Sequence, residues 1–164
     1  SKSLMKTVSL NRHAGLRWSR ATALLGAALV ATTPLFADET CTSPYMPKIT
    51  GQEEFIYVWT LGVEGWGDGS DKVVTVDVKP GSPTYGRIVA SASVGGRHEA
   101  HHGGFTDDRR ELWVSGLDTS HIFIFDVATD PAKPRLKKTI KDFAKKTGVV
   151  GPHGFYALPG RMLV

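Results

Sequence analysis

The sequence has only one cysteine, Cys41, among its 164 residues. A single thiol excludes an internal disulfide, so noncovalent contacts must hold the fold together. No apolar run reaches the about 20 residues that a helix needs to cross a bilayer. After residue 37, no segment has the period of a long amphipathic helix, and the best helical candidate, residues 141–148, is a short basic turn. These absences argue against a disulfide scaffold, a membrane span and an all-helical domain.

The N-terminal 37 residues have the pattern of a secretory signal peptide. Met5 resembles a true start, with Ser1–Leu4 as upstream read-through, and basic residues precede the apolar run 21–31. A small residue, Ala37, then stands before Asp38. A basic start, an apolar stretch of about 10 residues and a small residue at the cut are typical of such a peptide, which predicts cleavage after Ala37.

The positive charge of the chain belongs to this segment. The whole sequence has 20 Lys and Arg against 16 Asp and Glu, but the first 37 residues contain five basic residues and no acid. Removing them leaves 15 basic against 16 acidic residues, a net charge of −1. The charge therefore gives no reason to expect a nucleic-acid partner. No Arg-Arg pair precedes the apolar run, so we expect general secretion and a soluble, periplasmic protein.

Residues 38–164 are rich in short runs of β-branched and aromatic residues that alternate with Gly, Pro and Asp. The runs predicted as strands are residues 55–61, 72–78, 86–94, 111–117, 121–127 and 135–140, together with a strand that begins at His98–Phe105. Short strands without intervening helices predict an antiparallel, all-β fold.

Two landmarks recur at a similar distance. TVDV, with Asp77, and IFDV, with Asp126, end strands 49 residues apart, and HGGF at His102 resembles HGFY at His153, 51 residues later. A period near 50 predicts a β-propeller, with a β-sandwich as the alternative. Propellers close with 4 to 8 blades, so we expect 38–164 to be the N-terminal part of a truncated propeller, its first two to three blades. Between the blades we expect the tryptophans Trp59, Trp66 and Trp113.

Three histidines, His98, His101 and His102, lie within five positions between two Gly-Gly pairs. In a propeller, the first strand of each blade lines the central channel, so histidines at equivalent points of successive blades converge there. His153 occupies the equivalent point of the next blade. The cluster therefore predicts a metal site, whereas His121, at the start of an outer strand, is expected to be structural.

A regular strand, however, does not allow two of the clustered histidines to bind one ion. His101 and His102 would point to opposite faces, and His98 and His102 would lie about 13 Å apart, while metal–nitrogen bonds are about 2 Å. Either the glycines break the strand so that both adjacent imidazoles turn inward, or one histidine binds and the others orient it.

Several long blocks resemble the N-terminal part of the selenium-binding protein and methanethiol oxidase family, in its exported bacterial form. The blocks are CTSPYMPKITGQEEFIYVWTLG, GDGSDKVVTVDV, GGRHEAHHGGFTDDRRELW and IFIFDVATDPAKPRL. The resemblance implies a β-propeller, a homo-oligomer and a copper cofactor, with the histidine motifs of the family at His101, His102 and His153. It assigns no catalytic acid or base.

The activity that the resemblance implies is the conversion of methanethiol, O2 and water to formaldehyde, hydrogen sulfide and hydrogen peroxide. Copper suits both imidazole ligands and a soft sulfur substrate, and it is redox-active, whereas zinc is not. The alternative is a non-catalytic propeller that binds selenium or sulfur species or a protein partner. Vertebrate members have additional N-terminal cysteines, and this chain has only Cys41, so selenium binding is not expected.

Overall fold

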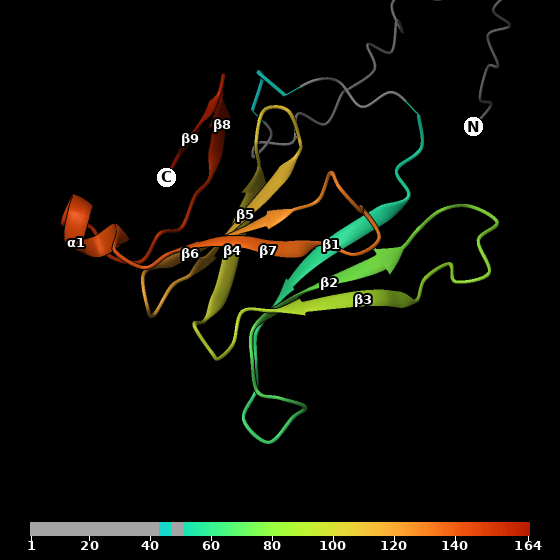
Figure 1. Cartoon of the computed structure of the whole chain (residues 1–164), viewed down its shortest axis with the longest axis horizontal. Helices are drawn as coiled ribbons and strands as arrows, with labels where there is room; N and C mark the ends of the chain where they lie inside the picture. The colour runs from blue at the N-terminus through green and yellow to red at the C-terminus, as the bar shows by residue number, and fades with distance from the viewer. Residues whose placement is uncertain (1–42, 47–50) are drawn as a thin grey trace, which may run out of the picture. The chain divides into compact units, whose positions relative to one another are not determined.

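A computed structural model describes residues 43–46 and 51–164. The predicted signal peptide and Cys41 lie outside the described residues. The described part contains nine strands and one short helix, α1 (Phe143–Thr147) (Figure 1). The strands are β1 (Phe55–Thr60), β2 (Lys72–Asp77), β3 (Ile88–Ser93), β4 (Ala100–Phe105), β5 (Glu111–Gly116), β6 (His121–Asp126), β7 (Arg135–Ile140), β8 (Tyr156–Leu158) and β9 (Arg161–Leu163). The all-β prediction is confirmed, and among these residues no helix is long and apolar enough to span a membrane.

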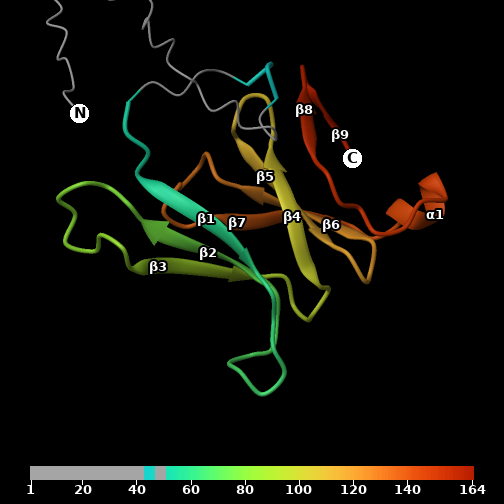
Figure 2. The same cartoon turned by 180° about the vertical axis from the view of Figure 1, so that it is seen from behind.

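The strands form three antiparallel sheets in chain order. The first contains β1–β2–β3, the second β4–β5–β6–β7 and the third β8–β9. The first two sheets lie side by side with the third beyond the second, as both views show (Figures 1 and 2). Strand β4, at one edge of the second sheet, contacts both β1 and β8. Separate antiparallel sheets that follow one another in chain order are what successive propeller blades require.

Strand pairing repeats with the predicted period. Phe105 of β4 pairs with Leu112 of β5, and Tyr156 of β8, 51 residues after Phe105, pairs with Leu163 of β9 in the same way. The pair β8–β9 is therefore the counterpart of β4–β5 and begins a third repeat. The propeller prediction is confirmed at the level of strand register, and the described sheets correspond to an incomplete propeller.

A register irregularity supports the same repeat at a second place. The pairing of β2 with β3 shifts between Thr75 and Val76, and that of β6 with β7 shifts between Ile124 and Phe125, 49 residues later. Strands β1–β2–β3 thus correspond to β5–β6–β7, the second to fourth strands of a blade. Among the described residues, the first sheet has no counterpart of β4, and β1 stands at the edge where that strand would pair.

Hydrophobic side chains fill the spaces on both sides of the second sheet. One core lies between the first and second sheets and consists of Val73, Leu112, Val114, Phe123, Phe125 and Val127, with Trp59 packed against it. A second core joins the second sheet to the segment around β8 and includes Ile122, Ile124 and Phe155, with Trp113 against it. Burial on both faces explains why residues 122–125 of β6, IFIF, are continuously apolar instead of alternating.

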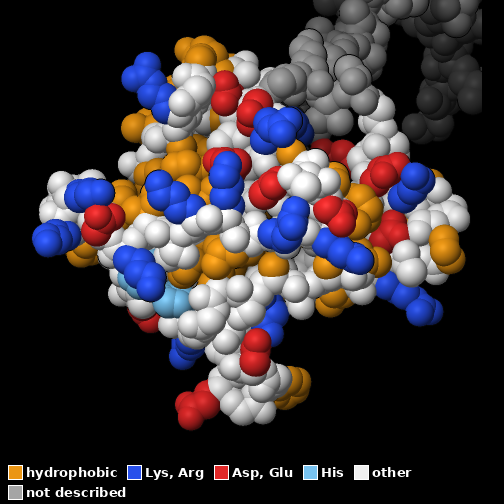
Figure 3. Space-filling view, in the orientation of Figure 1, with side chains coloured by type: hydrophobic (Ala, Val, Ile, Leu, Met, Phe, Trp, Pro, Cys, Tyr) orange, Lys and Arg blue, Asp and Glu red, His pale blue; other side chains and the backbone are white. Residues whose placement is uncertain are grey.

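One of the three tryptophan predictions is wrong. Trp59 and Trp113 pack between sheets as expected, but the Trp66 side chain is 80% exposed. Trp66 lies in the glycine-rich loop between β1 and β2, where Gly65, Gly67 and Gly69 adopt positive φ angles. These glycines turn the loop away from the sheet, and its tip shows acidic and hydrophobic side chains (Figure 3).

The base of this loop is fixed by a buried carboxylate. Asp71 is 0% exposed; its two oxygens accept the backbone N–H of Gly62 at 2.7 Å and that of His98 at 2.9 Å. Asp71 therefore ties the β1–β2 loop to the segment that leads into β4. We expect Asp71→Asn to lower the free energy of unfolding by about 2–3 kcal/mol, because hydrogen bonds to a charged acceptor contribute about 1.5–3 kcal/mol and a buried donor loses its partner.

Urea denaturation would measure this effect as a lower midpoint. The matched control is Asp68→Asn in the same loop, since the exposed Asp68 carboxylate contacts only Lys72 and the backbone N–H of Ser70. Its midpoint should hardly change. Equal midpoints for the two variants would contradict the role assigned to Asp71.

Candidate metal centre

The backbone of β4 is irregular where its two adjacent histidines lie. Ala100 pairs with Gly116 and Gly103 pairs with Val114, so His101 and His102 together oppose the single residue Ser115. This two-against-one arrangement is a β-bulge, which re-aims side chains that a regular strand would point to opposite faces. The two adjacent imidazoles do share one side, as in the first of the predicted alternatives, but the break lies at the histidines themselves, since Gly103 and Gly104 remain paired with β5.

Ser115 of the neighbouring strand β5 lies opposite the bulge, and its hydroxyl bonds to the bulged backbone. It is 0% exposed, and its hydroxyl accepts the N–H of His102 and donates to the carbonyl oxygen of His102, each at 3.2 Å. These bonds replace the ladder bonds that the bulge removes. The carbonyl of Ser115 in turn accepts the indole N–H of Trp59 at 2.8 Å, which connects this position to the first sheet.

His153 reaches the same place from the segment that leads into β8. This segment packs closely on β4, because a Cβ added at Gly104 would lie 3.0 Å from both the Cβ and the carbonyl oxygen of Phe155. The side chain of Phe155 is buried in the second core. Gly104 therefore permits the approach that brings His153 beside the bulge.

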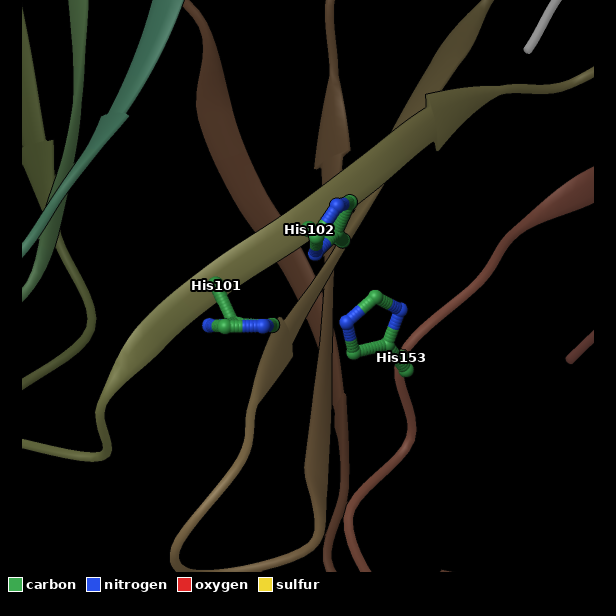
Figure 4. A group of neighbouring side chains, drawn as sticks. All are labelled: His101, His102 and His153. Carbon is green, nitrogen blue, oxygen red and sulfur yellow. The ribbon is translucent and has the colours of Figure 1, made fainter. Parts of the chain in front are cut away.

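The three imidazoles form one cluster. Ring centroids are 4.7 Å apart for His101 and His102, 4.7 Å for His101 and His153, and 4.0 Å for His102 and His153. One nitrogen from each ring lies within 4.8 Å of the others, and all three side chains are exposed. Figure 4 shows two rings attached to β4 and the third to the segment before β8.

This cluster fits a transition-metal ion. Two nitrogens bound to one ion at about 2 Å lie up to about 4 Å apart. Side-chain rotations that move each ring nitrogen by about 1 Å would therefore bring all three nitrogens into ligand positions. Exposed side chains can make such rotations at low cost. Imidazole is a ligand for Cu, Zn, Fe and Ni, and three imidazoles without a carboxylate or thiolate do not select the hard cations Mg²⁺ and Ca²⁺.

The environment favours the neutral form of His102. Desolvation lowers the pKa of His102 below its usual value, and the positive charges that His153 and His101 carry when protonated lower this pKa further. Crowded imidazoles disfavour simultaneous protonation. A neutral ring is the form that binds a metal.

The structure places His98 and His121 outside this cluster. The His98 ring lies 4.9 Å from that of Phe123 and 5.3 Å from that of His121, and its Nδ1 is 3.1 Å from the hydroxyl of Thr119. The expectation that His121 is structural agrees with its position on β6, where burial lowers its pKa. Of the clustered histidines, only His101 and His102 therefore share a site with His153.

A carboxylate pair beside the cluster had no signal in the sequence. Glu99, two residues before His101, has a positive φ of 61°, unusual for a residue other than glycine. A hydrogen bond with Asp118 and the charge of Asp118 raise the pKa of Glu99. Only the fold brings these two acids together, because they lie in different turns.

The chain belongs to the family described as 56 kDa selenium binding protein (SBP56), which residues 35–164 match. It is 64% identical over 145 residues to a methanethiol oxidase of Ruegeria pomeroyi, covering 87% of this chain and 33% of that protein. It is 60% identical over 141 residues to a methanethiol oxidase of Hyphomicrobium sp, covering 85% and 32%. The chain thus spans about a third of the length of these relatives.

Some more distant matches are named selenium-binding proteins. Selenium-binding protein 2 of Arabidopsis thaliana is 36% identical over 129 residues, covering 69% of this chain and 26% of that protein. The X-ray structure of a hypothetical selenium-binding protein from Sulfolobus tokodaii matches with a TM-score of 0.54 and 28% identity, over 66% of this chain and 27% of that one. This likeness supports the propeller assignment.

Proposed function

We propose that this chain is part of a copper-dependent methanethiol oxidase, and that His101, His102 and His153 hold the copper. The observation that supports the proposal most is the convergence of three imidazoles from two successive blades on one point. Two relatives at 60–64% identity have the name methanethiol oxidase, which supports the choice of substrate.

The reaction converts methanethiol, O2 and water to formaldehyde, hydrogen sulfide and hydrogen peroxide, and its atoms balance as written. Carbon is oxidised and O2 is reduced by two electrons. Copper, when bound, would supply the redox change and lower the pKa of the thiol. The protein's own contribution is to present three exposed imidazoles from β4 and from the segment before β8, where a small thiol has access.

The described residues divide this task between two elements. The bulge in β4 directs His101 and His102 to one side, and the packing of Phe155 on Gly104 brings His153 to them. Because the residues proposed to bind copper come from two blades, the site forms only when the third repeat packs on the second. Copper binding should therefore report on this packing.

The proposal extends to location and assembly. The basic start, apolar run and small residue at Ala37 support secretion to the periplasm. A homo-oligomer is part of the proposal because the resemblance of the sequence blocks implies one. Methanethiol and O2 are the proposed small-molecule partners.

Oxygen uptake by the purified full-length protein tests the function. We expect methanethiol-dependent oxygen uptake that falls at least about tenfold when a chelator removes copper, because the reaction needs a redox-active ion. Uptake should return when copper is added. Zinc is redox-inactive and cannot replace copper. Adding zinc to the copper-free protein is the control and should restore nothing.

Two results would contradict the proposal. Uptake that persists after copper is removed would exclude the cofactor. A folded, copper-loaded protein without uptake would exclude the activity and favour the alternative of a non-catalytic propeller that binds sulfur or selenium species.

A further inference from the structure

We infer that Ser115 is a positioning residue of the histidine cluster, because its hydroxyl holds the bulge that makes His101 and His102 neighbours. This inference rests on the proposed function where it concerns copper. Where it concerns the backbone of β4, it can be tested without metal.

The hydrogen bonds of Ser115 explain why the bulge needs this side chain. A bulge leaves backbone groups without ladder partners. Here the hydroxyl of Ser115 is both acceptor for the N–H of His102 and donor to its carbonyl oxygen. A hydroxyl can do both at once, whereas a methyl group can do neither.

The hydroxyl of Ser115 lies in a buried part of β5. Ser115 is fully buried, and its own carbonyl already accepts the indole N–H of Trp59. Its neighbours on β5, Val114 and Gly116, are buried as well. Without the hydroxyl, the backbone N–H and carbonyl oxygen of His102 would lose these two bonds.

The consequence for the site follows from strand geometry. The ladder can recover its lost bonds by removing the bulge, and adjacent residues of a regular strand point to opposite faces. His101 and His102 would then no longer face one space together. Ser115 touches no imidazole of the cluster by a hydrogen bond, so it acts through the backbone alone.

Amide hydrogen exchange of the copper-free, full-length protein is the first test. In Ser115→Ala we expect the amide of His102 to exchange about tenfold faster, since it loses its acceptor. The matched control is Thr75→Val, which removes a buried hydroxyl without a hydrogen-bond partner from the first sheet. Exchange at His102 should be the same in this control as in the unmodified protein.

Copper titration and electron paramagnetic resonance of the Cu(II) form are the second test. In Ser115→Ala we expect about 10- to 100-fold weaker copper binding, the range seen when a residue that orients ligands is lost, and a changed nitrogen hyperfine pattern. Thr75→Val should retain both. Ser115→Cys, with similar volume but weak hydrogen bonding, should shift in the same direction and provides the test if the alanine variant does not fold.

The outcomes separate the two proposals. If the unmodified protein binds no copper, the proposed function fails, and the exchange rate alone decides the role of Ser115. Unchanged exchange at His102 in Ser115→Ala would overturn the inference. Faster exchange with an unchanged copper affinity and spectrum would also overturn it, because the bulge would then not determine the site.

Discussion

Replacing His153 by alanine in the full-length protein is expected to lower copper affinity at least about a hundredfold. The reason is that His153 is one of only three imidazoles whose nitrogens lie within 4.8 Å of one another in the described residues, and loss of even an outer partner of a metal ligand costs about 10- to 100-fold. Its side chain is exposed, so truncation leaves no buried cavity and the fold should be unaffected. Copper titration would measure the affinity and circular dichroism the fold.

The matched control for this experiment is His98→Gln. His98 belongs to the same short histidine-rich segment but packs against Phe123 and His121, away from the cluster. Its variant should bind copper as the unmodified protein does. Retention of full copper affinity by His153→Ala, or an equal loss in both variants, would remove His153 from the site.

Replacing Gly104 by valine should affect both stability and the site. A Cβ at this position would already lie 3.0 Å from the Cβ and the carbonyl oxygen of Phe155, and the branched side chain is larger still. Overpacking of this kind costs about 1–3 kcal/mol. Because Phe155 is two residues from His153, relief of the clash moves His153 away from β4, and we expect copper affinity to fall about tenfold or more.

Urea denaturation and copper titration together test this prediction, with Gly154→Ala as control. Gly154 is adjacent to His153, but a Cβ there meets nothing within 4 Å. This variant should keep both the urea midpoint and the copper affinity. If Gly104→Val binds copper normally while its midpoint falls, the packing of the third repeat is not what brings His153 to the cluster.

Local sequence patterns were sufficient for the strands and the repeat. The runs predicted at 55–61, 72–78, 111–117 and 121–127 are strands that end within one residue of those limits. Alternating β-branched and aromatic residues bounded by Gly, Pro and Asp are a property of neighbouring residues. The 49- and 51-residue distances then reappear as equivalent registers, because a blade repeats its turns together with its strands.

The prediction that Trp66 packs between blades was wrong, because Trp66 is exposed. A tryptophan is usually buried at least in part, and the same rule placed Trp59 and Trp113 correctly. The glycines around Trp66 adopt positive φ angles and form a loop that leaves the sheet. Whether a large side chain finds a partner depends on what packs opposite it, which composition does not reveal.

The sequence by itself determined the class of fold, the repeat and the three histidines, because these depend on residue type and spacing along the chain. Only the tertiary structure decided how His101 and His102 come to face the same space. That outcome depends on a bulge opposite Ser115, 13 residues away from His102, and on the contact of Gly104 with Phe155. Backbone hydrogen bonds between strands and the closeness of their packing are set by partners distant in sequence, so no local pattern specifies them.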